Sequence, residues 1–147
     1  MSEVGIPSGE TSERQVLLVH EDVATMRLVR EALESFTVST VDSSPNAVYA
    51  FERALQKPYD LFVFSLSLPE IHGELLYELI AKAYQHCHAG SRTAPAIIYL
   101  GEQRHAARVD ELQRDARVKG VVMRPIRLDT FLKKAHQVLP AKDPAQF

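Results

Sequence analysis

The segment DLFVFSLSLPEIHG, residues 60–73, constrains the fold of this chain more than any other part of its sequence. It opens with an apolar run that only Ser65 and Ser67 interrupt. A run this short, and this rich in Phe and Val, is typical of a strand buried on both faces, as in a parallel sheet. A proline and a glycine then indicate a loop, and a helical pattern follows. Ligands and chemistry collect at the carboxyl ends of such strands, so we expect Ser65 to lie at a site.

Four other short apolar runs predict further strands, and helical spacing of apolar residues predicts a helix after each strand. Ser44 and Pro45 indicate the N-cap and first turn of the second helix. The third helix is expected to bury Leu75 and Leu79, among others. The predicted strands span residues 15–20, 37–41, 60–68, 96–100 and 120–123, and the predicted helices residues 23–36, 45–57, 74–85, 101–119 and 128–139.

This alternation predicts an α/β fold with a doubly wound parallel sheet, right-handed crossovers and helices on both faces. A chain of 147 residues is the natural size of one domain, which we place at residues 15–140. Residues 1–14 carry too little apolar surface to fold, so we expect a disordered tail there and a short tail at 141–147. The sequence leaves open whether this domain stands alone or was cut from a longer chain.

Composition excludes several classes of protein. The net charge of −2 argues against the clustered basic surface of a nucleic-acid-binding protein. The lone cysteine, Cys87, excludes an internal disulfide and fits a reducing compartment. No apolar run approaches the roughly 20 residues that span a bilayer. The first residues lack a basic region followed by an apolar one, so we expect no signal peptide. We therefore expect a cytoplasmic protein that binds neither nucleic acid nor membrane.

Several chemically distinctive residues fall where the predicted strands end. In an open parallel sheet the ends of the first and third strands flank the switch point of the topology. The ends of the fourth and fifth strands lie beside them. The residues brought together in this way are Glu21, Asp22, Ser65, Leu100 and Arg124.

The order and position of these segments give the chain a clear family resemblance. Four motifs stand at strand ends, in the order in which a known family has them. They are VLLVHED followed by TMR, DLFVFSLSLPEIHG, PAIIYLG and VVMRP. In this the chain resembles the receiver domain of two-component response regulators, over roughly residues 15–139. The resemblance implies a flavodoxin-like, CheY-like sheet of five strands in the order 2-1-3-4-5.

The resemblance also implies roles for the residues at the strand ends, and most of these positions depart from the family's pattern. Glu21 and Asp22 match the acidic pair that binds Mg²⁺. Ser65 stands where the family has its phosphoacceptor aspartate, and Leu100 where it has the switch serine or threonine. Arg124 stands in place of the family's lysine, and the switch aromatic falls near Val121.

These departures argue against phosphoryl transfer. A serine hydroxyl needs a base to become a nucleophile. With Ser65 in place of an aspartate, a hard cation such as Mg²⁺ loses one of its three carboxylate ligands. Leu100 cannot hydrogen-bond a phosphoryl oxygen, and Arg124 is free to pair with Glu21 or Asp22. The expected protein is a pseudo-receiver in signal transduction, without catalytic residues or a required cofactor, and with Mg²⁺ binding weak at most.

Such a protein would act by protein–protein interaction. Receivers often bind partners through the fourth helix, fifth strand and fifth helix, so the same face is the candidate interface here. Its partner would be another signalling protein or a second copy of the chain. The residues expected on this face are Arg104, Arg108, Glu111, Val121 and Arg127.

Other functions stay open at this stage. A conventional receiver could be phosphorylated at another residue, such as Ser67 or Asp60. A small hydrolase could use Ser65 with His20 as its base, although no G-x-S-x-G elbow surrounds this serine. A flavin or nucleotide binder would need a glycine loop after the first strand, where the sequence is the acidic HEDVATM.

Overall fold

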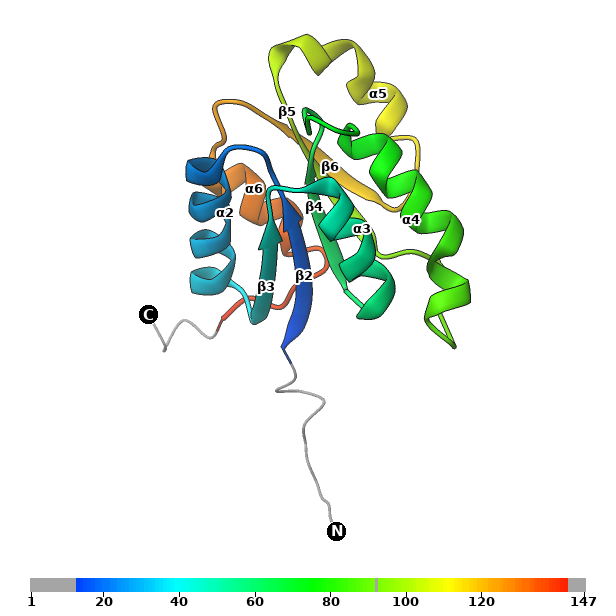
Figure 1. The fold of residues 1–147 in the computed structure, drawn as a ribbon. Helices are drawn as coiled ribbons and strands as arrows, with labels where there is room; N and C mark the ends of the chain where they lie inside the picture. Colours follow the sequence, from blue (N-terminus) through cyan, green and yellow to red (C-terminus); the bar gives the residue numbers. More distant parts are fainter. Residues whose placement is uncertain (1–12, 92, 143–147) are drawn as a thin grey trace.

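The structure is a computed structural model that describes residues 13–91 and 93–142. A single sheet of five parallel strands runs through its centre, in the order β3-β2-β4-β5-β6 (Figure 1). Numbered along the chain, this is the predicted order 2-1-3-4-5, so the fold prediction is confirmed. The strands are β2 (Arg14–Val19), β3 (Ser39–Ser44), β4 (Leu61–Ser65), β5 (Ala96–Gly101) and β6 (Val118–Met123).

Helices cover both faces of this sheet (Figure 1). α2 and α6 pack on one face, whereas α3, α4 and the short α5 lie on the other. The helical segments are α2 (Val23–Phe36), α3 (Ala47–Gln56), α4 (Gly73–Cys87), the 3₁₀ helix η1 (Gln103–Arg108), α5 (Val109–Leu112) and α6 (Leu128–Ala135).

The central strand β4 explains why the sheet is buried on both sides. All five of its residues are buried. Successive side chains of a strand point to opposite faces, so Leu61 and Val63 join the core under α2 and α6. Phe62 and Phe64 join the aromatic core under α3 and α4. The apolar run in the sequence therefore reflects two cores that share one strand.

The predicted helix at residues 101–119 is wrong in kind and in length. The chain instead forms η1, followed by the single helical turn of α5, and β6 already begins at Val118. Of the thin apolar stripe that predicted the helix, only Leu112 is fully buried. An α-helix is held mainly by the burial of an apolar face, and this segment has little to bury.

Other differences are smaller. The second strand lies at residues 39–44 instead of 37–41, and the third ends at Ser65 instead of continuing to residue 68. The N-cap of α3 is Asn46, whose side-chain oxygen accepts the N–H of Tyr49 at 3.0 Å. Ser44 ends β3, and its hydroxyl accepts the N–H of Asn46 at 3.0 Å.

The side chains of α4 also differ from expectation. Its buried residues are Gly73, Leu76, Tyr77, Ile80 and Tyr84, whereas Leu75 and Leu79 are exposed. The two bulky tyrosines turn the buried face of the helix toward the sheet, which leaves both leucines on its outer side.

Both predicted tails lie largely outside the described residues, at 1–12 and 143–147. Two residues assigned to them are structured. Arg14 begins β2, and Ala141 forms an antiparallel bridge with Thr37. Among the described residues, every helix is too short or too polar to cross a lipid bilayer.

Candidate functional site

The carboxyl ends of four neighbouring strands meet at one edge of the sheet, as the topology predicts. Ser65, at the end of β4, is paired in register with Leu100 of β5. The N–H of Arg124, just after β6, donates to the carbonyl of Gly101 at 2.9 Å. Asp22 follows β2 on the other side of β4. The five residues expected at the site therefore lie on the same edge.

Asp22 joins the start of α2 to the end of β6. Its Oδ2 accepts the Thr25 N–H at 3.3 Å and the Thr25 hydroxyl at 2.5 Å, so it is the N-cap of α2. Arg124 Nη2 donates to the same Oδ2 at 3.1 Å and to Thr25 Oγ1 at 3.2 Å. The Thr25 hydroxyl is the main cause that lowers the pKa of Asp22, and the Arg124 guanidinium adds to it. This oxygen is thus already used for a helix cap and an ion pair.

Glu21 has a different environment. The neighbouring His20 is buried, and its Nδ1 accepts the N–H of Asp22 at 3.0 Å. Burial lowers the pKa of His20, and outweighs the nearby Glu21 carboxylate, which acts in the opposite direction. Since a neutral ring accepts at Nδ1, the 3.5 Å approach of Glu21 Oε1 to that nitrogen is not an ion pair. Among the described residues, this Glu21 oxygen has no hydrogen-bond partner.

Ser65 is a buried residue whose hydroxyl is occupied by the chain that follows it. Its Oγ accepts the N–H of Ser67 at 3.0 Å, and the residue is 2% exposed. The start of α4 packs directly against it, because a Cβ on Gly73 would lie 2.2 Å from the Ser65 carbonyl oxygen. Leu100 is equally buried and packs in the core beneath α2 and α6. Neither side chain is open to solvent.

A polar network beside Ser65 was not expected from the sequence. Ser67 Oγ donates to Glu102 Oε2 at 3.3 Å, and Arg104 Nη2 donates to Ser67 Oγ at 2.9 Å. Arg104 Nε also contacts Glu102 Oε1 at 3.3 Å. Burial alone would raise the pKa of Glu102, but the hydrogen bonds from Arg104 and Ser67 and the charge of Arg104 lower it. The one sequence signal was the position of Glu102, immediately after β5.

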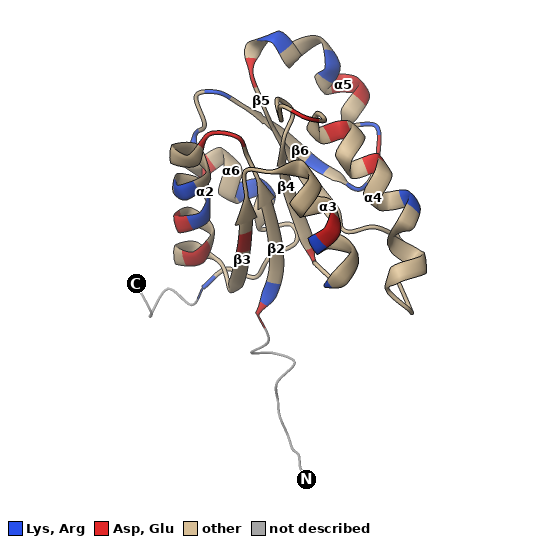
Figure 2. Cartoon of the chain, viewed as in Figure 1, with Lys and Arg blue, Asp and Glu red and all other residues tan. Residues whose placement is uncertain are grey.

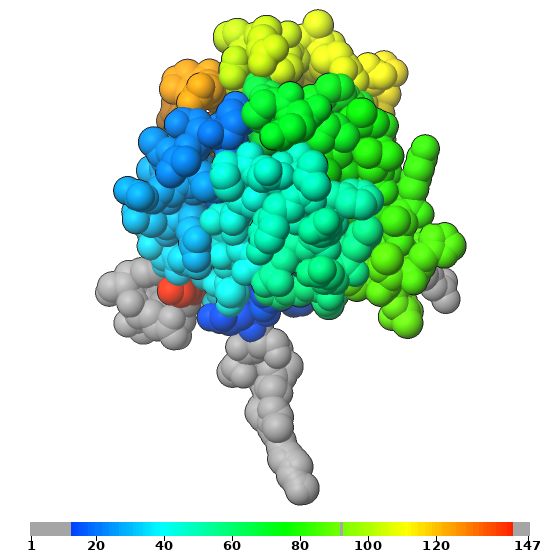
Figure 3. All heavy atoms as spheres, in the orientation of Figure 1, coloured from blue at the N-terminus to red at the C-terminus, as the bar shows by residue number. Residues whose placement is uncertain are grey.

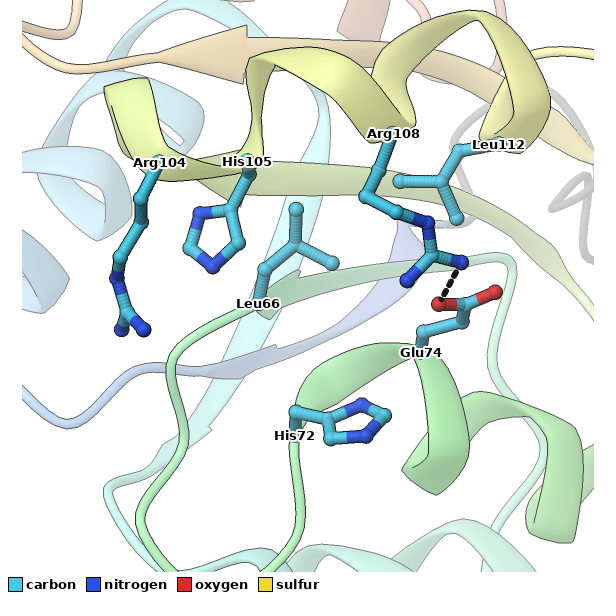
Figure 4. A pocket seen from close by; sticks show the side chains of 7 residues that line it. All are labelled: Leu66, His72, Glu74, Arg104, His105, Arg108 and Leu112. Carbon is cyan, nitrogen blue, oxygen red and sulfur yellow. Dashed lines mark hydrogen bonds and ion pairs between the residues drawn. The ribbon is translucent and has the colours of Figure 1, made fainter.

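Next to this network lies a cavity of about 190 Å³ between the start of α4 and the η1–α5 segment (Figure 4). Arg108 Nη2 and Glu74 Oε1 form an ion pair across it at 2.6 Å. Arg108 of η1 therefore turns toward α4, whereas Arg104 turns toward the loop after β4, where it contacts Ser67. The cavity is lined by Leu66, His72, Glu74, Arg104, His105, Arg108 and Leu112.

The residues expected at a partner interface lie in different environments. Arg104 and Arg108 make the intramolecular contacts described above. The side chains of Glu111 and Arg127 are largely exposed. Val121 differs from the expectation, because it is only 8% exposed and belongs to the core beneath α4. Alternate residues of β6 face opposite sides of the sheet, and both sides are covered there, so Val121 joins one core and Val122 the other.

Comparison with known proteins identifies the fold. No protein-family model matches the chain, and no curated protein matches it. Solved structures do match: a CheY-like response regulator receiver domain protein from Methanospirillum hungatei JF-1 has 18% identity and a TM-score of 0.67, over 86% of this chain and 93% of that one. The chain has the receiver fold.

Two further structures agree. The signal receiver domain of an HD domain-containing protein from Pseudomonas fluorescens Pf-5 has 16% identity and a TM-score of 0.70, over 86% of this chain and 94% of its own. A response regulator receiver domain protein from Clostridium thermocellum has 12% identity and a TM-score of 0.69, over 84% of this chain and 92% of that one. At these identities the similarity establishes the fold and leaves function to be argued from the site.

Receiver domains hold Mg²⁺ with carboxylates at this edge of the sheet, and the residues here do not fit that ion. Mg²⁺ requires several oxygen ligands in near-octahedral geometry. Asp22 Oδ2 already bonds to Thr25 and Arg124, and Ser65 offers a hydroxyl that is engaged by Ser67. Glu21 keeps a buried carboxylate oxygen without a hydrogen-bond partner among the described residues, and that one oxygen does not complete the ligand set. Within residues 13–91 and 93–142, no three His, Cys, Asp or Glu side chains gather as a metal site. The guanidinium of Arg124 supplies the positive charge beside Asp22.

Proposed function

We propose that this protein is a regulatory module of two-component signalling, located in the cytoplasm, that works without phosphorylation of Ser65. The observation that carries the proposal is the ion pair between Arg124 Nη2 and Asp22 Oδ2 at 3.1 Å. It joins two segments that are 102 residues apart in the sequence. In an ordinary receiver this region would respond to a phosphoryl group on an aspartate.

Ser65 stands where that aspartate is expected, and its surroundings do not favour phosphoryl transfer. A hydroxyl is a weak nucleophile unless a base removes its proton. Ser65 Oγ accepts a backbone N–H, and in the described part of the chain no histidine nitrogen is hydrogen-bonded to it. The Nδ1 of His20, the expected base, is engaged with the N–H of Asp22. The same geometry argues against a serine hydrolase.

Arg124 is suited to hold this region in one state. A guanidinium is charged at every physiological pH and presents several donors in a fixed plane. Arg124 uses one terminal nitrogen for both Asp22 and Thr25, and so connects the end of β6 to the first turn of α2. Leu100, at the end of β5, has no group that could hydrogen-bond a phosphoryl oxygen. The proposed module therefore has no switch that phosphate could operate.

Signalling would then depend on the surfaces that the fold presents. The segment from η1 to α6 is the candidate interface for another signalling protein or a second copy of the chain. Glu111 and Arg127 offer exposed charges there, whereas Val121 is buried. Arg108 would have to leave Glu74 to reach a partner.

Ser67 is the second candidate, as an alternative phosphorylation site. Its hydroxyl lies 2.9 Å from the Arg104 guanidinium, which could hold a phosphoryl group, but also 3.3 Å from Glu102, which would repel one. Asp60 is a poorer candidate. Its Oδ2 accepts the N–H of Gln15 at 2.7 Å, at the amino end of the strands and opposite the site.

Incubation with acetyl phosphate and Mg²⁺, followed by intact-mass measurement, tests the proposal. We expect no stoichiometric phosphoryl adduct. An adduct that persists in the Ser65→Ala variant but disappears in Ser67→Ala would instead support the second candidate. An adduct that Ser65→Ala abolishes would overturn the proposal, and an ordinary receiver measured in parallel serves as the positive control.

A further inference from the structure

A groove lined only by apolar side chains runs between α3 and α4, on the face of the sheet opposite α2 and α6. Its volume is about 180 Å³. We call it the α3–α4 groove. Its lining residues are Ala47, Val48, Phe51, Ile71, Leu76 and Leu79.

The rim of the α3–α4 groove is also apolar, although it lies in solvent. Val48 is 58% exposed, Leu79 40% and Leu75 39%. A surface helix normally carries polar residues on its outer face, and contiguous exposed apolar side chains mark interaction sites. α3 and α4 lie side by side and form one continuous surface in the space-filling view (Figure 3). The exposed side chains are therefore a patch that a partner could cover.

Acidic residues accompany this patch. Glu52 follows Val48 by one helical turn, Glu78 follows Leu75 by three residues, and Glu70 directly precedes the groove residue at position 71. All three glutamates are exposed, and none has an ion-pair partner among the described residues. Figure 2 shows acidic positions on both helices. Lys82, four residues after Glu78, offsets only part of this charge, so the groove favours a basic ligand.

The backbone around the groove favours a helical ligand over an extended one. An extended peptide needs a free sheet edge for its main-chain hydrogen bonds, but the edges of this sheet are β3 and β6. None of the groove residues belongs to a strand. A helix satisfies its own backbone groups and offers apolar residues at spacings of three and four. It can pack between α3 and α4 as a third helix.

We propose that the α3–α4 groove binds an amphipathic helix of a partner protein, with an apolar stripe flanked by Lys or Arg. A second copy of this chain does not fit, because its acidic groove would meet an identical one, and like charges opposed at an interface are unfavourable. A membrane surface does not fit either, because anionic lipids attract basic segments. This proposal is independent of the state of Ser65.

A synthetic peptide of about 15 residues, with leucines at helical spacing and lysines between them, is the probe for this site. Peptides of the same composition in scrambled order, and with Glu in place of Lys, are the controls. We expect the leucine–lysine peptide to shift the amide NMR signals of residues 47–56 and 71–82, and both control peptides to bind at least about tenfold more weakly.

Substitutions in the groove and at its acidic residues test which side chains contribute to peptide binding. Val48→Ser and Leu79→Ser together should weaken peptide binding by about tenfold or more, as removal of interface anchors does. Glu52→Lys with Glu78→Lys should weaken it further. Val23→Ser, at an exposed position of α2 on the other side of the sheet, is the matched control and should leave binding unchanged.

Four outcomes would overturn the proposal. They are no measurable binding of the leucine–lysine peptide, equal binding of the scrambled peptide, NMR shifts confined to another face, and equal loss of binding in Val23→Ser. Sedimentation that shows a dimer abolished by Leu79→Ser would assign the groove to a second copy instead. Adsorption to phosphatidylglycerol vesicles that the same change abolishes would assign it to a membrane.

Discussion

At the scale of single residues, one carboxylate oxygen joins the start of α2 to the segment after β6. Asp22 Oδ2 accepts from the backbone and hydroxyl of Thr25 and from Arg124. The sequence predicted that Arg124 would pair with Glu21 or Asp22, and the structure selects Asp22. It could not predict the part played by Thr25, because that depends on the exact start of α2. Glu21 instead lies beside the buried ring of His20.

The pKa of Asp22 should report these contacts. Thr25→Val and Arg124→Gln should each raise it toward the ordinary value of an aspartate, and Thr25→Val should raise it more, because the hydroxyl hydrogen bond is the larger cause. A titration of the Asp22 carboxyl carbon by NMR measures both shifts. Arg127→Gln, which removes an exposed arginine paired with Asp129, is the control and should leave Asp22 unchanged. A larger effect of Arg124→Gln than of Thr25→Val would contradict this ranking.

His20 should make the fold sensitive to mild acid. Its pKa in the folded protein lies below the ordinary value of 6.5, so the unfolded chain binds more protons as the pH falls through that value. The stabilising contribution is therefore present above pH 6.5 and lost as the pH falls toward the folded pKa. Urea denaturation between pH 7.5 and about 5.5 should show falling stability, and the slope should be smaller in His20→Asn. An unchanged slope in that variant would contradict the assignment.

At the scale of elements, the sequence predicted all five strands and four of the five helices. Strands such as β4 and β5 are buried on both faces and are therefore continuous apolar runs. The site's location followed from the same reasoning, since the carboxyl ends of parallel strands meet at one edge. The helix predicted at residues 101–119 was wrong, because the apolar stripe of this segment is too thin to hold a long helix. The network of Ser67, Glu102 and Arg104 lies in the loop after β4 and at the start of η1, whose conformations no periodic pattern encodes.

The contact between β4 and α4 should be intolerant of change. A Cβ at Gly73 would lie 2.2 Å from the backbone oxygen of Ser65, so Gly73→Ala must displace backbone and should destabilise the fold by about 3 kcal/mol. Gly120→Ala is the matched control. The atoms nearest its Cβ would be the flexible methylenes of Lys134, and the cost should be less than about 1 kcal/mol. Urea denaturation of both variants gives the two values, and equal costs would contradict this account of the packing.

At the scale of the whole molecule, the two sides of the sheet have different roles in this account. α2 and β6 meet through Asp22 and Arg124 at the site, where the proposed module has lost its response to phosphate. α3 and α4 cover the opposite face and carry the apolar groove. The receiver fold was predictable from the four motifs at the strand ends, whereas the groove was not, because Leu75 and Leu79 were expected in the core.

Mg²⁺ should not stabilise this molecule. A ligand that binds only the folded state raises its stability according to concentration and affinity, and the residues beside Asp22 do not fit the ion. The thermal midpoint should therefore be the same in Mg²⁺ and in chelator. Ser65→Asp adds a carboxylate at the end of β4, and any rise in its midpoint with Mg²⁺ measures how far the site is from binding the ion. A clear rise in the thermal midpoint of the unmodified protein with Mg²⁺ would show that these residues do bind the ion.

The most direct test of the central claim is an amide NMR spectrum recorded before and after addition of acetyl phosphate and Mg²⁺. Because Arg124 already holds Asp22, we predict that the signals of residues 20–25, 65–67 and 100–104 and that of residue 124 will keep their positions. Shifts that begin at Ser65 and extend through residues 100–104 to the η1 segment would contradict the account. They would show that the site still responds to phosphate.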